Sequence, residues 1–202
     1  MKPEATVFVV DDDEAMCDSL RSLMESVGLS VETYATAETF LDGYDAARPG
    51  CLLLDIRMPG MSGLELQEKL VSDRVRIPTI IISAHGDIEQ AVRSIKTGAV
   101  DFIKKPYKGE TLLTRIHEAI DLDARQRLDE AENAAIASRF ARLTPREREV
   151  MSHLVDGKSP KQIAFELGLS RKTVDVHRGH IMAKMQADSL IELARMRPGV
   201  GQ

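Results

Sequence analysis

Four apolar segments of strand length each end beside a side chain that can bind a metal ion or a phosphoryl group. Carboxylates crowded at one edge of a sheet repel one another unless a cation lies among them, and a site of carboxylates and water suits Mg2+. A hydroxyl, an ammonium group and Mg2+ around one carboxylate are what a phosphoryl group needs around its oxygens. Each feature alone is weak, because a strand-end aspartate often only caps a turn. The residues, in chain order, are Asp11 and Asp12, Asp55, Ser83 and Lys105.

These segments belong to five alternations of an apolar, strand-length run with a helix. Runs that are apolar at every position are typical of strands buried on both faces of a parallel sheet. The sequence therefore predicts an α/β domain with a doubly wound, five-stranded parallel sheet, in which the strand ends bring the polar side chains to one edge. The expected strands lie at 7–10, 29–34, 51–54, 78–83 and 100–104, and the expected helices at 14–27, 37–44, 63–72, 87–97 and from 108 onward.

The charge of the chain is unevenly distributed. Residues 1–120 carry 13 basic and 20 acidic side chains, for a net charge of −7, and residues 121–138 carry a net charge of −3. Residues 139–202 carry 12 basic and 7 acidic side chains, so this tail, with +5, is the part suited to meet phosphates. The sequence has no apolar run of membrane-spanning length and does not begin with a signal-peptide pattern. We therefore expect a cytoplasmic protein without a membrane partner.

The first part of the chain resembles the receiver domain of two-component response regulators, which has a flavodoxin-like or CheY-like fold. The stretches VVDDDE, LLLDIRMPGMSG, IIISAHGD and DFIKKPY carry the resemblance, over about residues 5–120. It implies that a sensor histidine kinase phosphorylates Asp55, which becomes a 4-aspartylphosphate. It also implies a Mg2+ site formed by Asp11, Asp12 and Asp55 with the backbone carbonyl of Arg57.

The same resemblance assigns the residues that respond to the phosphoryl group. Ser83 corresponds to the switch hydroxyl and Lys105 to the phosphate-pairing ammonium group, with the Lys105-Pro106 bond expected to be cis. Phe102 corresponds to the switch aromatic, and a packed core ring is its alternative role. Phosphorylation would then pair two receivers through apolar side chains of the fourth helix and fifth strand, namely Ile88, Val92, Ile95 and Val100.

The segment 121–138 is predicted to be a helical linker that continues the fifth helix. No Gly or Pro occurs from Thr111 to Ala137, and Ala, Glu, Leu and Arg dominate the composition. Apolar residues recur there at helical spacing and form a narrow stripe, which could pack on a second chain or on the tail. A plain helical spacer is the alternative. We therefore expect three parts, at 1–120, 121–138 and 139–202.

The tail is predicted to contain a helix-turn-helix within a small all-α domain. A Thr-Pro-Arg-Glu capping box at 144–147 opens one helix, and Ser159-Pro160 opens the next. A Gly turn then precedes a longer, basic helix at 171–186. An antiparallel helical hairpin is the alternative, which the positive charge disfavours.

This tail resembles the LuxR-type DNA-binding domain of the NarL/FixJ regulators over about residues 140–197. The stretches LTPREREV, KSPKQIAFELGLSRKTVDVHRGHIMAKM and SLIELARM carry the resemblance, and VDVHRGHIMAKM is closest to FixJ-like members. It implies double-stranded promoter DNA as a partner, with RNA polymerase as a further candidate. Helical spacing predicts base contacts from Lys172, Asp175, Val176 and Gly179. Phosphate contacts are expected from Lys161, Ser170, Arg171, Thr173 and Arg178.

Together these features predict a two-component response regulator in which phosphorylation of Asp55 controls homodimerisation and DNA binding. Release of the tail's third helix from cover by the receiver is a competing account of activation. We expect no enzymatic activity beyond self-catalysed phosphoryl acceptance and autodephosphorylation. A phosphatase of the haloacid-dehalogenase type is disfavoured, because it needs a second Asp two residues after its nucleophile, where Arg57 stands. DNA binding regardless of phosphate is the remaining alternative, against which the complete acidic pocket argues.

Overall fold

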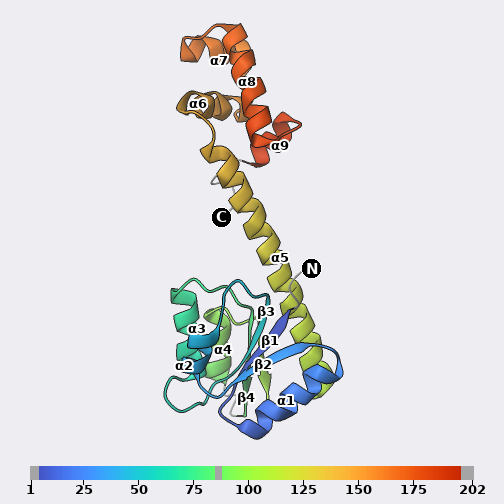
Figure 1. Cartoon of the computed structure of the whole chain (residues 1–202). Coiled ribbons are helices and arrows are strands. Elements are labelled where there is room, and N and C mark those ends of the chain that lie inside the picture. The colour runs from blue at the N-terminus through green and yellow to red at the C-terminus, as the bar shows by residue number, and fades with distance from the viewer. Residues whose placement is uncertain (1–4, 85–87, 197–202) are drawn as a thin grey trace. The chain divides into compact units, whose positions relative to one another are not determined.

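The computed structural model describes residues 5–84 and 88–196, and the chain divides into two compact units between Arg127 and Leu128 (Figure 1). Strands and helices alternate in the first unit, whereas the described residues of the second unit form helices. Helix α5, Gly109–Ala141, begins in the first unit and continues into the second. The predicted class, an α/β domain followed by a smaller all-α domain, is confirmed.

The strands of the first unit form one parallel sheet in the order β2-β1-β3-β4-β5. Every residue of β1, β3 and β4 is buried, as expected for apolar runs in a doubly covered sheet. The register pairs Asp55 with Ile82 and Ser83 with Lys104, so the polar strand ends meet at the same edge. The strands are Thr6–Val10 (β1), Ser30–Tyr34 (β2), Gly50–Asp55 (β3), Thr79–Ser83 (β4) and Asp101–Lys104 (β5).

Helices cover both faces of this sheet and enclose two apolar cores (Figure 1). Phe8 and Leu52 face the core that α2 and α3 cover, whereas Val9 and Leu53 face the core beneath α1 and α5. Alternate residues serve opposite cores because side chains alternate across a strand. Each fully buried apolar side chain contributes roughly 1.5–3 kcal/mol. The helices are Glu14–Ser26 (α1), Ala37–Gly43 (α2), Gly63–Ser72 (α3) and Ile88–Lys96 (α4).

Side-chain caps fix where several of these helices begin. Ser62 and Glu65 form a capping box at the start of α3. Asp13 caps α1, because its side chain accepts hydrogen bonds from the backbone amides of Ala15 and Met16. Asp13, which follows Asp11 and Asp12 directly, is therefore a helix cap. The expected start of the fourth helix, Asp87, lies outside the described residues.

The long helix α5 has the uninterrupted course that its composition predicts, and the first compact unit extends along it past residue 120. Residues 121–127 belong to the first compact unit, and Asp123 is only 2% exposed. The expected linker at 121–138 is thus helical, with its first two turns packed on the receiver. Neither α5 nor any other helix of the described residues is both long and apolar enough to cross a membrane.

The second unit contains α6 (Pro145–Val155), α7 (Pro160–Leu167), α8 (Arg171–Met185) and α9 (Leu190–Arg195). Capping boxes with proline at the first turn open α6 and α7; the sequence predicted the box of α6 and the start of α7 at Ser159-Pro160. Gly168 ends α7 in the left-handed conformation (φ 64°), which glycine adopts without steric cost. The helices enclose one apolar core, whose fully buried members are Val150, Ile163, Val174, Ile181, Met185 and Leu193.

Glu147 ties α6 to α8 inside this unit. Its side chain is 4% exposed, accepts the backbone amide of Thr144 at 2.8 Å, and accepts Lys184 Nζ at 2.6 and 2.8 Å. His180 Nδ1 lies 3.9 Å from the same carboxylate. The hydrogen bond from Lys184, opposed by burial and helped by the amide of Thr144, lowers the pKa of Glu147 to about 2. The carboxylate is therefore bound more tightly in the folded unit than the neutral acid.

We predict that this pair makes the second unit acid-sensitive. A group whose folded pKa is about 2 and whose ordinary value is 4.5 stabilises the fold above pH 4.5, and the contribution is lost as the pH falls toward 2. Glu147→Gln should therefore melt at a lower temperature than the wild type at pH 7, with the difference shrinking between pH 4.5 and 2. Thermal unfolding across this range measures it, with the exposed Glu149→Gln as control. A difference that stays constant with pH would contradict the role of the ion pair.

Candidate phosphoryl-acceptor pocket and DNA-binding helix

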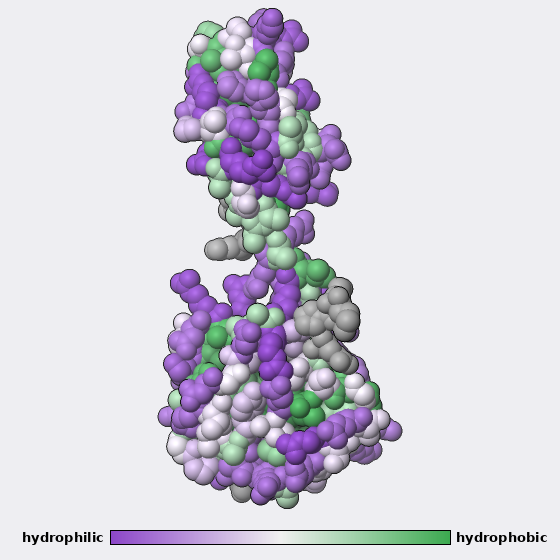
Figure 2. All heavy atoms as spheres, viewed as in Figure 1, coloured by the Kyte–Doolittle hydropathy of each residue, from purple (hydrophilic) through white to green (hydrophobic). Residues whose placement is uncertain are grey.

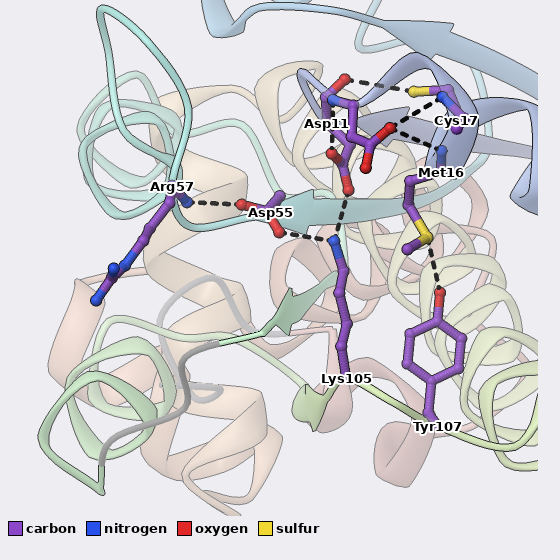
Figure 3. Close-up of polar contacts among 9 residues, drawn as sticks. Asp11, Met16, Cys17, Asp55, Arg57, Lys105 and Tyr107 are labelled. Carbon is purple, nitrogen blue, oxygen red and sulfur yellow. Dashed lines mark hydrogen bonds and ion pairs between the residues drawn. The ribbon is translucent and has the colours of Figure 1, made fainter.

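Lys105 lies between two carboxylates at the carboxyl edge of the sheet (Figure 3). Its Nζ donates to Asp11 Oδ2 at 2.8 Å and to Asp55 Oδ1 at 2.9 Å. Asp11 follows β1, Asp55 ends β3 and Lys105 follows β5, so the sheet alone brings the three groups together. Three of the five residues singled out at the strand ends thus form one contiguous cluster.

Backbone amides hold the remaining oxygens of the two carboxylates. The amide of Asp13 donates to Asp11 Oδ1 at 3.0 Å, and the amide of Arg57 donates to Asp55 Oδ2 at 2.7 Å. Asp11 and Asp55 are 4% and 8% exposed, and burying an unpaired charge costs several kcal/mol. Burial alone would lower the pKa of Lys105, but its hydrogen bonds to Asp11 and Asp55 outweigh burial and raise that pKa. The pocket therefore holds a charged lysine between two aspartates.

The donors of the predicted Mg2+ site are hard oxygens, but they are not gathered as a finished cluster. Asp12 is exposed beside the buried Asp11. In the described part of the chain, no three acidic, histidine or cysteine side chains converge closely enough to hold a metal ion. The chemistry still fits, since Asp11 and Asp55 bring two negative charges against the single charge of Lys105 and carboxylate oxygens are the ligands that Mg2+ prefers.

The two predicted switch residues lie on the neighbouring strands β4 and β5. Ser83 is 2% exposed, and its carbonyl oxygen accepts the backbone amide of Lys105 at 2.8 Å. Phe102 pairs with Ile81, two residues before Ser83, and its partly buried ring packs against the core beneath α2 and α3. The Lys105-Pro106 bond is cis, as expected.

The apolar side chains predicted to pair two receivers are exposed on α4 and in the turn before β5. Exposed fractions are 83% for Ile88, 46% for Val92, 46% for Ile95 and 40% for Val100. Large exposed apolar side chains that cluster are typical of interaction surfaces. An ion pair at 2.6 Å between Arg93 of α4 and Glu68 of α3 adds charged groups to this helix.

Helix α8 separates a buried face from an exposed one. Val174, Ile181 and Met185 are fully buried, with His177 half-buried at the margin. A Cβ placed on Gly179 would have no atom within 4 Å, so this position is open to close approach by a base edge. Figure 2 shows a largely hydrophilic surface over the visible face of the second unit. Of the predicted DNA contacts, Thr173 is half-buried and the others are exposed: Lys161, Ser170, Arg171, Lys172, Asp175, Val176, Arg178 and Gly179.

Comparison with known proteins identifies both units. Residues 7–117 match the response regulator receiver domain, and residues 141–197 match the bacterial regulatory proteins of the luxR family. The chain belongs to the response-regulator family. It is a two-component response regulator that combines a receiver domain with a LuxR-type DNA-binding domain.

Full-length relatives support this assignment. Response regulator protein TodT of Pseudomonas putida is 42% identical over 192 residues, which cover 95% of this chain and 85% of TodT. Transcriptional regulatory protein FixJ of Bradyrhizobium diazoefficiens is 41% identical over 201 residues, which cover 100% of this chain and 98% of FixJ. Among solved structures, response regulator StyR aligns with a TM-score of 0.86 at 44% identity, covering 96% of this chain and 98% of StyR. The similarity to FixJ-like regulators inferred from the tail is confirmed.

Sequence reasoning missed two ion pairs in which the carboxylate is buried. Glu147 was recognised as part of a capping box, but its bond to Lys184 joins residues 37 positions apart and leaves no local pattern. Asp123 and Arg127 do stand at the i and i+4 spacing of helical ion pairs, which was the available signal. Ion pairs on the surface of a helix have the same i and i+4 spacing, so the spacing alone did not show that Asp123 is buried.

We predict that Lys105→Met destabilises the receiver. Removing one partner of a buried ion pair typically costs about 3–5 kcal/mol, because Asp11 and Asp55 then face each other unneutralised. Mg2+ should recover part of the loss, since a divalent cation can replace the missing charge. Urea unfolding with and without Mg2+ measures both effects, and Lys104→Met, at an exposed neighbour, is the matched control. Equal free energies of unfolding for the two variants would show that the ammonium group of Lys105 does not stabilise the receiver.

Proposed function

We propose that Asp55 is the residue on which this response regulator receives its phosphoryl group. The observation that carries the proposal is the position of Asp55: its carboxylate ends β3, is 8% exposed and has one oxygen 2.9 Å from an ammonium group. The regulator would act in the cytoplasm, and the donor would be the phosphohistidine of a sensor histidine kinase. An Asp55 oxygen forms the new bond to phosphorus as the bond from phosphorus to the kinase histidine breaks.

The residues around Asp55 would stabilise the transferred group. Lys105, already within hydrogen-bond distance of Asp55, would pair with a phosphoryl oxygen. Bound Mg2+ would neutralise further charge, held by Asp11, Asp12, Asp55 and the backbone carbonyl of Arg57. These are the roles of the pocket in receiving and losing phosphate, and we propose no separate enzymatic activity.

We further propose that the structural effect of phosphorylation is transmitted to the surface through β4 and β5. Ser83 would donate its hydroxyl to the phosphoryl group, and Phe102 would fill the space that Ser83 leaves. The surface formed by Ile88, Val92, Ile95 and Val100 would then pair two receivers. A homodimer brings two DNA-binding units onto one duplex and raises their effective concentration.

The DNA-binding unit, proposed at 139–202, would read promoter DNA with α8. Lys172, Asp175, Val176 and Gly179 lie on its exposed face and would approach base edges. The phosphate contacts would come from Lys161, Ser170, Arg171, Thr173 and Arg178. The receiver would occupy 1–120 in this division and the linker 121–138, with RNA polymerase as a candidate partner of the DNA-bound dimer.

Phosphoryl acceptance is testable on the full chain. Incubation with acetyl phosphate and Mg2+ should add one phosphoryl group to the wild type, detected by intact mass, and none to Asp55→Asn. Asp12→Asn should accept it more slowly and need more Mg2+, because a ligand charge is lost. The exposed Asp129→Asn, on the linker helix, should behave like the wild type. A phosphoryl group retained on folded Asp55→Asn would refute the assignment.

DNA recognition predicts different outcomes for two basic residues of α8. Lys172→Ala should relax sequence preference, because it removes a base contact. The binding free energy should fall by about 1–3 kcal/mol, and only for the DNA sequences that the wild type prefers. Arg178→Ala should weaken all sequences alike and reduce the slope of log affinity against log salt by about 1. Anisotropy titrations at several salt concentrations distinguish the two. Identical behaviour of both variants on matched and scrambled duplexes would contradict these roles.

A further inference from the structure

The last turns of α5 within the receiver are fastened by a network that phosphoryl chemistry does not use. Asp123 Oδ2 accepts the backbone amide of Gly50 at 2.9 Å and Arg127 Nε at 2.8 Å. Arg127 Nη1 donates to the carbonyl oxygens of Ala46 and Ala47 at 3.1 and 3.2 Å, and its Nη2 donates to that of Arg48 at 2.6 Å. We call Asp123 and Arg127, with these five hydrogen bonds, the α5 latch.

One partner of the latch, Gly50, begins β3, and the other partners lie in the turn just before this strand. Gly50 is the first residue of this strand and Asp55 the last, so one central strand carries the latch at one end and the phosphoryl acceptor at the other. A Cβ on Gly50 would lie 1.9 Å from the carbonyl oxygen of Thr6 on β1, and its φ is 153°. The backbone here is thus fixed by close contact between two central strands.

The latch also marks where α5 leaves the receiver. Arg127 is the last residue of the first compact unit, Leu128 is 61% exposed, and residues 129–135 are all exposed. Earlier contacts of α5 with the sheet come from Leu112, Ile116 and Ala119, which are fully buried. Helices without tertiary contacts are marginally stable in water. Without the latch, the helix between Ala119 and Leu128 would lose its buried polar anchor.

We infer that Asp123 and Arg127 are positioning residues for signal transmission from the receiver to the DNA-binding unit. They hold the linker helix on the receiver through residue 127, so that the segment joining the two units starts from a fixed point and in a fixed direction. This inference rests on the proposed function, since it assumes that phosphorylation at Asp55 alters DNA binding. Detaching residues 120–127 would lengthen the segment that the receiver does not hold, and a longer flexible connection lowers the effective concentration of the second DNA-binding unit.

Arg127→Ala is the direct test, in the full chain. Arg125→Ala is the matched control, because Arg125 is exposed on the same helix and its Nε donates to the carbonyl oxygen of Asp121 within that helix. The probe is a duplex selected from a random pool by the wild type treated with acetyl phosphate and Mg2+. The readout is the ratio of its affinities with and without acetyl phosphate. We expect the ratio to fall at least about fivefold in Arg127→Ala and to be unchanged in Arg125→Ala.

Two further measurements separate this role from general destabilisation. Phosphoryl uptake at Asp55 should be unchanged, and amide hydrogen exchange should quicken in residues 120–127 while β3 and β4 stay protected. If Arg127→Ala does not fold, Arg127→Lys replaces it. Lysine keeps the charge, but its three donors sit on one nitrogen and cannot replace the four bonds of the guanidinium, so it should show a partial loss.

The outcomes distinguish the latch from the proposed function. A wild type that takes up phosphate without any change in DNA affinity would overturn the proposed function, and the transmission role with it. A wild type that responds, together with an Arg127 variant that exchanges faster but keeps the full ratio, would overturn the latch alone. Unchanged exchange in the variant would show that the latch does not hold the helix.

Discussion

The ion pairs of Lys105 with Asp11 and Asp55 are the constraint on which the receiver depends. Three charges are buried at one edge of a sheet, which is unfavourable unless they contact one another with good geometry. Contacts of 2.8 and 2.9 Å form only if β1, β3 and β5 end at the same level. The site therefore depends on the register of the parallel strands. The same arrangement leaves a net negative charge that a divalent cation can balance.

This charge arrangement connects the pocket to the strands beside it. The backbone amide of Lys105 bonds to the carbonyl of Ser83, so the ammonium group and the predicted switch hydroxyl belong to one hydrogen-bonded segment. Phe102 packs on the core two positions along the same strand pair. A phosphoryl group added to Asp55 would therefore act on groups that β4 and β5 already connect to the core.

Much of this could be predicted because the information was local. Continuous apolar runs identified the strands, Thr-Pro-Arg-Glu identified the start of α6, and polar strand ends identified Asp55 and Lys105. The latch and the Glu147–Lys184 pair could not, because their partners come from distant parts of the chain. The first compact unit runs to Arg127, past the boundary expected at residue 120, for the same reason: residues 121–127 resemble an exposed helix in composition. Asp123 and Arg127 nevertheless bond to backbone groups of residues 46–50.

As proposed, phosphate on Asp55 acts by pairing two receivers through the exposed apolar residues of α4 and of the turn before β5. Sedimentation velocity of the full chain with Mg2+, before and after treatment with acetyl phosphate, tests it most directly. Pairing predicts a monomer that becomes a dimer on phosphorylation, and a smaller shift when exposed Ile88 is replaced by Ser. An unchanged mass on phosphorylated protein that nevertheless binds DNA more tightly would contradict pairing and favour release of the DNA-binding unit.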